Sequence, residues 1–174
     1  MKHIYACFCL FLLSNVVTAD NHILTLEQLF QGNIMGAFGQ KLGAVVDEKL
    51  EFVGETSTGA LKYEFKPEKP DPMFKNYFIY ATPVSKVIYQ IVMSGRGANC
   101  IERRKILKAV LDNKYSSLKR QTLDWAHYFE HLDGRRTIWL YCEYGEFLGL
   151  KYLDVELEAR VVEEKTSQVD KSNF

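Results

Sequence analysis

Two histidines lie four residues apart in the segment His127-Tyr128-Phe129-Glu130-His131. On a helix both imidazoles would project from the same side, where they could bind a metal ion or serve an enzyme site. On a strand they would be polar edge residues. The spacing marks no third ligand, and the glutamate does not stand where it does in an HExxH motif. We therefore expect no functional metal site and no cofactor, and keep His127 and His131 only as a candidate pair.

The start of the chain has the three parts of a secretory signal peptide. The basic start Met1-Lys2-His3 precedes an apolar run from Ile4 to Leu13, and the small residues Val17 and Ala19 stand where signal peptidase needs them. The apolar run is about half of the roughly 20 residues that a membrane-spanning helix requires. Residues 1–19 are thus predicted to be removed by cleavage between Ala19 and Asp20. The mature chain would be periplasmic or secreted and without a transmembrane segment.

Cleavage would remove Cys7 and Cys9 and leave Cys100 and Cys142. Two cysteines in an exported protein predict one disulfide bond, the alternative being two buried free thiols. Periodicity places both on apolar faces, so a helix packed on the strand of Cys142 would bring the two sulfurs together. Closing a loop of about 43 residues would stabilise the fold by roughly 4 kcal/mol. The inward geometry argues against a nucleophilic cysteine with His127 as its base.

Aromatic residues provide a second candidate site. In the strand predicted over residues 136–142, alternation puts one apolar set on one face: Ile138, Leu140 and Cys142. Trp139 and Tyr141 face the other side, and Phe147 of the following segment joins them. If no other part of the chain covers these three side chains, they form an aromatic contact patch. The alternative is that the terminal helix or the Gly-rich segment packs there and makes them core.

The run Ser94-Gly95-Arg96-Gly97 follows the best predicted strand and precedes the best predicted helix. An exposed Ser-Gly-Arg loop resembles the inhibitory loop of some periplasmic lysozyme inhibitors. That resemblance implies that Arg96 could pair with catalytic carboxylates of a hydrolase. The rest of that family's pattern is missing, and short Ser/Gly/Arg runs are common turns. Arg96 is nevertheless a candidate interaction residue.

The strands that must position these residues are marked by alternation and by turn residues. Lys86 to Met93 is apolar on both faces, which predicts a central strand. Other strands are expected over residues 60–66, 77–81, 136–142 and 147–152, with a hairpin turn at Asp133-Gly134. Residues 116–121 read as a loop, and 123–132 as an aromatic segment of either type. The glycines between residues 27 and 43 predict a loop with a tight turn at 38–43.

Three helices are expected. The best begins at Asn99, which could form a capping box with Glu102. Its buried stripe would consist of Ile106, Leu107, Val110, Leu111 and Tyr115. A short helix is predicted over residues 44–51. Residues 153–164 fit a helix on Leu153, Leu157 and Val161, although they would also alternate as a strand, and the polar tail 166–174 is expected to be disordered.

These elements predict one α+β domain over residues 20–165, with a subdivision conceivable near 94–99. The expected architecture is an antiparallel sheet, or sheets, with two or three helices packed on one face, and a tandem helix-plus-hairpin plan over 44–93 and 99–152 is one form of it. The layout resembles exported bacterial domains of the β-lactamase-inhibitor-protein-like and outer-membrane-assembly-lipoprotein types. The turn at 38–43, the Cys100 helix and the Cys142 strand are similar to those of small periplasmic proteins of unknown function. These resemblances imply a Gram-negative source and no assigned chemistry.

The composition narrows the partners. The chain has 22 basic and 22 acidic residues, so it lacks the basic field of a nucleic-acid-binding protein. Ten tyrosines and eleven phenylalanines leave aromatic surface available for contacts. We therefore expect a non-enzymatic binding protein whose partner is a protein or another envelope component. An immunity or hydrolase-inhibitor protein is the first alternative, and an envelope enzyme with a site near His127 and His131 is the second.

Overall fold

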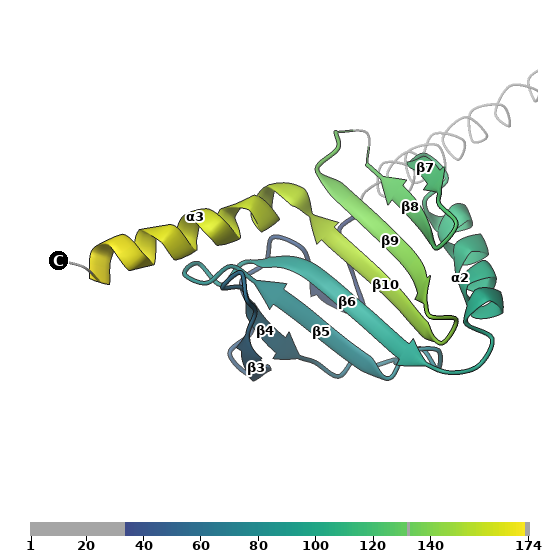
Figure 1. Ribbon diagram of the computed structural model, residues 1–174, viewed down its shortest axis with the longest axis horizontal. Coiled ribbons are helices and arrows are strands. Elements are labelled where there is room, and N and C mark those ends of the chain that lie inside the picture. The colour runs from purple at the N-terminus through teal and green to yellow at the C-terminus, as the bar shows by residue number, and fades with distance from the viewer. Residues whose placement is uncertain (1–33, 132, 173–174) are drawn as a thin grey trace, which may run out of the picture.

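The fold is built on an antiparallel sheet of 8 strands, in the order β3-β4-β5-β6-β10-β9-β8-β7 (Figure 1). The computed structural model describes residues 34–131 and 133–172. The predicted signal peptide and its cleavage site lie outside the described residues.

The sheet consists of two four-stranded meanders. The first contains β3 (Glu51–Glu55), β4 (Leu61–Glu64), β5 (Asn76–Ala81) and β6 (Ile88–Arg96). The second contains β7 (Lys119–Thr122), β8 (Ala126–Glu130), β9 (Arg136–Glu143) and β10 (Phe147–Asp154). The last strands of the meanders pair with each other, from Phe147 opposite Arg96 to Leu153 opposite Gln90. A small hairpin of β1 (Gly36–Ala37) and β2 (Gln40–Lys41) precedes the sheet and contains the predicted tight turn.

Helix α2 (Cys100–Lys114) covers one face of the sheet. Leu107 and Leu111 are buried along its length, and Tyr115 is buried just after its end. They pack against strand residues that alternate onto the same face: Ile91, Met93, Ile138, Leu140, Leu148, Leu150 and Tyr152. This is the main hydrophobic core.

The buried stripe of α2 is narrower than predicted. Ile106 and Val110 are 55% and 56% exposed. The helix contacts the sheet along the row of residues spaced by four, and the neighbouring positions turn to solvent because each residue advances the helix by about 100°. The predicted capping box is also wrong, because Asn99 has a left-handed backbone and makes no side-chain cap, and Glu102 pairs with Lys105 instead.

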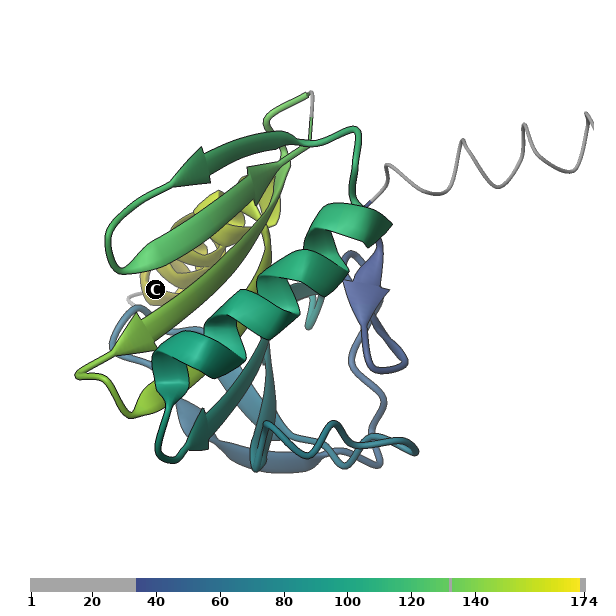
Figure 2. The same ribbon diagram turned by 90° about the vertical axis from the view of Figure 1, so that its right-hand side faces the viewer.

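Helix α3 (Val155–Ser172) packs on the opposite face of the sheet (Figure 2). Its residues Leu157 and Val161 are buried with Leu153 and Tyr89 in a smaller, separate core. Leu153 and Tyr152 are consecutive on β10, so they point to opposite faces and into different cores. The prediction that the helices share one face is therefore wrong, while an α+β fold on an antiparallel sheet is confirmed.

Three local predictions differ from the structure. Residues 44–50 form a bridge and a turn, with Val45 opposite Val87 and the Leu50 amide donating to Asp47, so the first helix of the tandem plan is replaced by irregular chain. Residues 119–122, expected as loop, form the edge strand β7, whose four side chains are all exposed. Helix α3 continues to Ser172, through most of the segment expected to be disordered.

The two cysteines lie at disulfide distance, as predicted. Cys100 begins α2 and is fully buried, and its Cα atom is 6.0 Å from that of Cys142 on β9. The bond joins the helix that covers the main core to the second meander.

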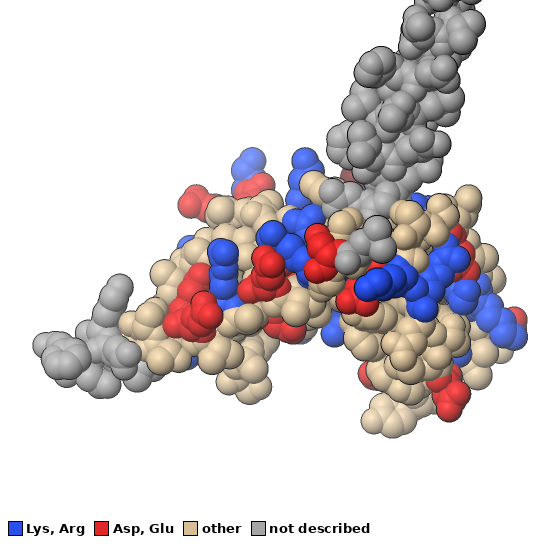
Figure 3. Space-filling model, turned by 90° about the horizontal axis from the view of Figure 1, so that it is seen from above, with Lys and Arg blue, Asp and Glu red and all other residues tan. Residues whose placement is uncertain are grey.

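The surface carries charges of both signs. On the face shown in Figure 3, acidic and basic side chains are interspersed along the surface. Within residues 34–131 and 133–172, no helix is both long and apolar enough to span a membrane.

Candidate functional site

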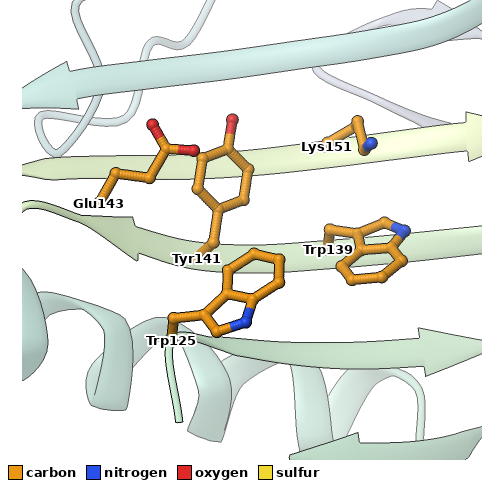
Figure 4. Close-up of a pocket in the computed structure, with 5 residues that line it drawn as sticks. All are labelled: Trp125, Trp139, Tyr141, Glu143 and Lys151. Atoms are coloured by element: carbon orange, nitrogen blue, oxygen red, sulfur yellow. The ribbon is translucent and has the colours of Figure 1, made fainter. Parts of the chain in front are cut away.

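A pocket of about 290 Å³ opens on the sheet face that lies opposite α2 (Figure 4). Its lining comes from β9, from β10 and from the turn that connects β7 to β8: Trp125, Trp139, Tyr141, Glu143 and Lys151. Helix α3 packs on this same face near the end of β10 at Leu153, and from there it leads away from β9 and β8 (Figure 1). The two helices that the structure describes therefore leave this part of the sheet open.

Strand register brings the lining together. Trp139, Tyr141 and Glu143 alternate onto one face of β9. Lys151 is the direct partner of Trp139 on β10, so both side chains point to that face. Trp125 stands beside them because its carbonyl accepts a hydrogen bond from the Cys142 amide at 3.1 Å.

The two indoles are nearly parallel. The ring centroids of Trp125 and Trp139 lie 6.1 Å apart, and the ring planes differ by 16°. Tyr128 of β8 supports Trp139 from the side, with a centroid distance of 4.5 Å. Trp125 is 51% exposed, so the pair presents aromatic surface to solvent.

Tyr141 lies across a strand position that has no side chain. Its direct partner on β10 is Gly149, and a Cβ atom at that position would collide with the Tyr141 ring. Burial, with a further contribution from the Glu143 carboxylate, raises the pKa of the Tyr141 phenol. Tyr141 thus remains a neutral hydrogen-bond donor and acceptor at the pocket.

Lys151 completes the lining with a cation. Its Nζ atom is 5.5 Å from the centroid of the Trp139 ring, within the range of a cation–π contact. The pocket therefore combines an aromatic wall of two nearly parallel indoles with one carboxylate, one phenol and one ammonium group.

No protein-family model, curated protein or solved structure matches the chain. The chemistry of its surfaces is therefore the basis for any functional assignment.

The predicted aromatic residues divide between two places on the open face. Trp139 and Tyr141 are half-buried and line the pocket, and α3 leaves them uncovered. Phe147 is 40% exposed at the start of β10, where the Arg96 guanidinium lies 5.2 Å from its ring centroid. The patch hypothesis and the terminal-helix hypothesis each describe part of this face, because α3 covers only one end of it.

Three lining residues were missed by the sequence analysis. Trp125 lay in a segment whose secondary structure was ambiguous, and Lys151 acquires its place only through its pairing with Trp139. Glu143 continues the alternation of Trp139 and Tyr141, so the pattern could have found it one step further along β9.

The Ser-Gly-Arg run is not an exposed loop. Ser94, Gly95 and Arg96 are the last residues of β6, and they pair with β10. The Arg96 side chain is exposed, but it forms an ion pair with Glu146 at 2.7 Å. The geometry on which the lysozyme-inhibitor resemblance depended is therefore absent from this segment.

The two candidate histidines do not converge. The segment is strand β8, and four residues of strand span about 13 Å, too far for two ligands of one ion. His127 is buried on the side of α2, whereas His131 lies beyond the strand and contacts Asp133 at 2.8 Å. Among the described residues, no group of three or more His, Cys, Asp or Glu side chains could hold a metal ion.

His127 is also poorly suited to act as a general base for a cysteine. Burial lowers the pKa of His127, and the nearby Arg104 and Lys108 cations lower it further. Its Nδ1 atom lies 3.3 Å from the Thr122 hydroxyl, and Cys100 and Cys142 are paired with each other. The His127 imidazole is therefore a weaker base than a free histidine, and it lies beside a hydroxyl partner.

Proposed function

We propose that the chain is an exported, non-enzymatic binding protein of the bacterial envelope, and that its ligand binds at the pocket formed by Trp125, Trp139, Tyr141, Glu143 and Lys151. Export rests on the predicted signal peptide, and the cysteine pair at disulfide distance suits an oxidising compartment.

The observation that carries the binding role is the open aromatic wall. Tryptophan and tyrosine are the residues most enriched at binding hot spots, because they offer a large apolar body with a polar edge. Here both tryptophans of the sequence line one pocket on a sheet face that α3 leaves uncovered. A fold stabilised only for itself gains little from holding two indoles at the surface.

Cosedimentation with envelope material tests this role. The mature protein is mixed with separated insoluble fractions of a Gram-negative envelope and centrifuged. We expect it to pellet with one fraction, and Trp125→Ala to lower the bound share because half of that indole is exposed for contact.

Phe52→Ala is the matched control. Phe52 is an aromatic residue with 56% exposure, but it lies on β3, at the edge of the sheet far from the pocket. Its removal should leave binding unchanged. If Trp125→Ala and Phe52→Ala behave alike, or if no fraction retains the protein, the proposed role is wrong.

The mass of the protein recovered from cells tests export separately. Expressed with its full sequence in a Gram-negative host, the protein should have Asp20 as its first residue and should weigh two hydrogens less than the reduced chain. An intact Met1, or two free thiols, would contradict export.

A further inference from the structure

The polar groups of the pocket have no partners of their own. Within the part of the chain that the structure describes, no ion pair or side-chain hydrogen bond joins Glu143, Tyr141 or Lys151 to another residue. The nearby acid Glu146 is different, because Arg96 neutralises it. The pocket therefore presents one acceptor-only group, one donor-only group and one group that does both.

This set of groups fits a ligand that carries hydroxyls. A hydroxyl both donates and accepts, so hydroxyls on different units of one ligand can donate to the Glu143 carboxylate and accept from the Lys151 ammonium, whose positions are four residues apart along the strands. The charges of Glu143 and Lys151 cancel, which favours a neutral ligand over an ionic one. A cationic ligand would also meet Lys151 already placed near the face of Trp139.

The aromatic wall fits a flat ring with C–H groups on its face. A hexopyranose whose substituents are all equatorial exposes only C–H bonds on each face, and these are attracted to the electron-rich face of an indole. The stacked indoles of Trp125 and Trp139 differ by only 16° in orientation, so sugar rings of one extended chain can meet both indoles in the same orientation. Units joined by equatorial β-linkages keep such a chain extended and flat.

We propose that the ligand of this pocket is a neutral oligosaccharide of β-linked hexopyranose units, stacked on Trp125 and Trp139 and hydrogen-bonded by Glu143, Tyr141 and Lys151. This inference rests on the proposed binding function and names its ligand. The pocket volume of about 290 Å³ lies just below the range of about 300–1,000 Å³ that is usual for ligand pockets. The pocket therefore holds a short stretch of the glycan while the open sheet face lets the rest continue.

A proline-rich peptide is the main competing ligand, since such peptides also dock on aromatic grooves. Proline has no backbone N–H, so a proline-rich segment offers few donors and would leave the Glu143 carboxylate unpaired in the contact. A sugar, in contrast, carries several hydroxyl groups that can donate hydrogen bonds to the Glu143 carboxylate. The polar lining thus favours the oligosaccharide.

Tryptophan fluorescence gives a direct test, because the sequence contains only two tryptophans and both line the pocket. The protein with its disulfide intact is titrated with cellotriose, with chitotriose and with a proline-rich peptide. We expect at least one of the two oligosaccharides to produce a saturable change in emission, and the peptide to produce none.

Variants connect the signal to the pocket. Trp125→Ala and Glu143→Ala should each weaken oligosaccharide binding about tenfold, as loss of a central contact does. Phe52→Ala is the control for the first variant. Glu146→Ala is the control for the second, since Glu146 is a neighbouring acid that is already paired with Arg96. Trp125 and Glu143 are exposed enough for their variants to fold, which circular dichroism verifies before titration.

The outcomes separate this inference from the function on which it rests. If neither oligosaccharide changes the emission, or if binding is indifferent to Trp125→Ala and Glu143→Ala, the carbohydrate proposal is overturned. A saturable signal from the peptide that Trp125→Ala abolishes would retain a binding function at this pocket and still overturn the carbohydrate. Failure of the cosedimentation together with all three titrations would overturn both.

Discussion

The ring of Tyr141 occupies the space where any other residue at position 149 would place its Cβ atom. Glycine at this point of β10 is therefore a requirement of the pocket wall and not of the strand. A central strand position is otherwise a poor place for glycine, which has no side chain to pack.

The substitution Gly149→Ala should displace the Tyr141 ring and destabilise the protein by about 1–3 kcal/mol, the usual cost of overpacking. The same substitution made together with Tyr141→Ala should cost much less, because the clash is gone. Urea denaturation of the two single variants and the double variant measures this coupling. Equal costs of Gly149→Ala in both backgrounds would mean that the ring does not lie over the glycine.

At the residue scale, the sequence predicted the β9 part of the pocket and little else. Strand alternation was sufficient for Trp139 and Tyr141, because a period of two needs no knowledge of neighbours. Lys151 and Gly149 depend on the register between β9 and β10, which the hairpin around Gly145 sets. The place of Trp125 in the pocket depends on where the turn between β7 and β8 ends, and local sequence propensity does not determine that position.

Helix α3 is held to the sheet by two acidic residues, one just before its first turn and one near its middle. Near its start, the buried Asp154 carboxylate accepts a hydrogen bond from the Leu157 amide at 3.2 Å. Arg135 and Arg136 each approach the same carboxylate with Nε at 3.1 Å. Further along, Glu164 accepts hydrogen bonds from the amides of the turn between β5 and β6.

The substitution Asp154→Asn should destabilise the protein by about 3 kcal/mol, since it removes the buried charge between two arginines while retaining a capping oxygen. Asp133→Asn is its control. Asp133 pairs with His131 at the surface, so its loss should cost less than about 1 kcal/mol. Thermal and urea unfolding give both values, and similar costs for the two variants would show that the Asp154 cluster contributes no more than a surface pair.

Glu164 should make the attachment of α3 dependent on pH. Burial would raise the pKa of Glu164, but hydrogen bonds from Ser85 and Val84 outweigh it and hold that pKa below the ordinary value of 4.5. A carboxyl whose pKa is lower when folded stabilises the protein above its unfolded pKa, and the stabilisation is lost as the pH falls through the folded pKa.

The difference in unfolding free energy between the parent and Glu164→Gln measures this effect. It should be about 1 kcal/mol near neutral pH, because solvent screens a partly exposed carboxylate, and it should shrink to nearly zero in acid. Hydrogen exchange should localise the loss to α3 and to the turn at residues 82–87. A difference that does not change with pH would show that the Glu164 charge has no role.

At the element scale, long apolar repeats in the sequence predicted strands and helices correctly, whereas short polar segments did not reveal their structure. The strands around Lys86 to Met93 and the helix after Asn99 were predictable because their core faces repeat over many residues. The edge strand β7 has only exposed polar side chains, so its sequence cannot be distinguished from a loop. The face on which α3 packs follows from tertiary packing, which no periodicity encodes.

The disulfide acts on the whole molecule. Reduction should lower the unfolding free energy by about 4 kcal/mol, because the bond closes a loop between residues 42 apart in sequence. Denaturant titration with and without a reducing agent measures this. The variant with Cys100 and Cys142 changed to alanine should match the reduced protein and be insensitive to the reductant. A reductant effect in that variant would assign the loss to something else.

The order of the strands leaves one seam through the molecule. The strands of the two meanders pair only where β6 lies beside β10, and the cysteine bond joins β9 to α2, both of which follow β6 in the chain. The backbone between Arg96 and Cys100 is thus the single covalent tie across the seam in the described chain. A protein cut there would be two polypeptides that share a sheet and the main core, and the seam would become a heterodimer interface. If the two halves were synthesised separately and each fused to one member of a protein pair, their reassembly into the native form would report that the pair associates.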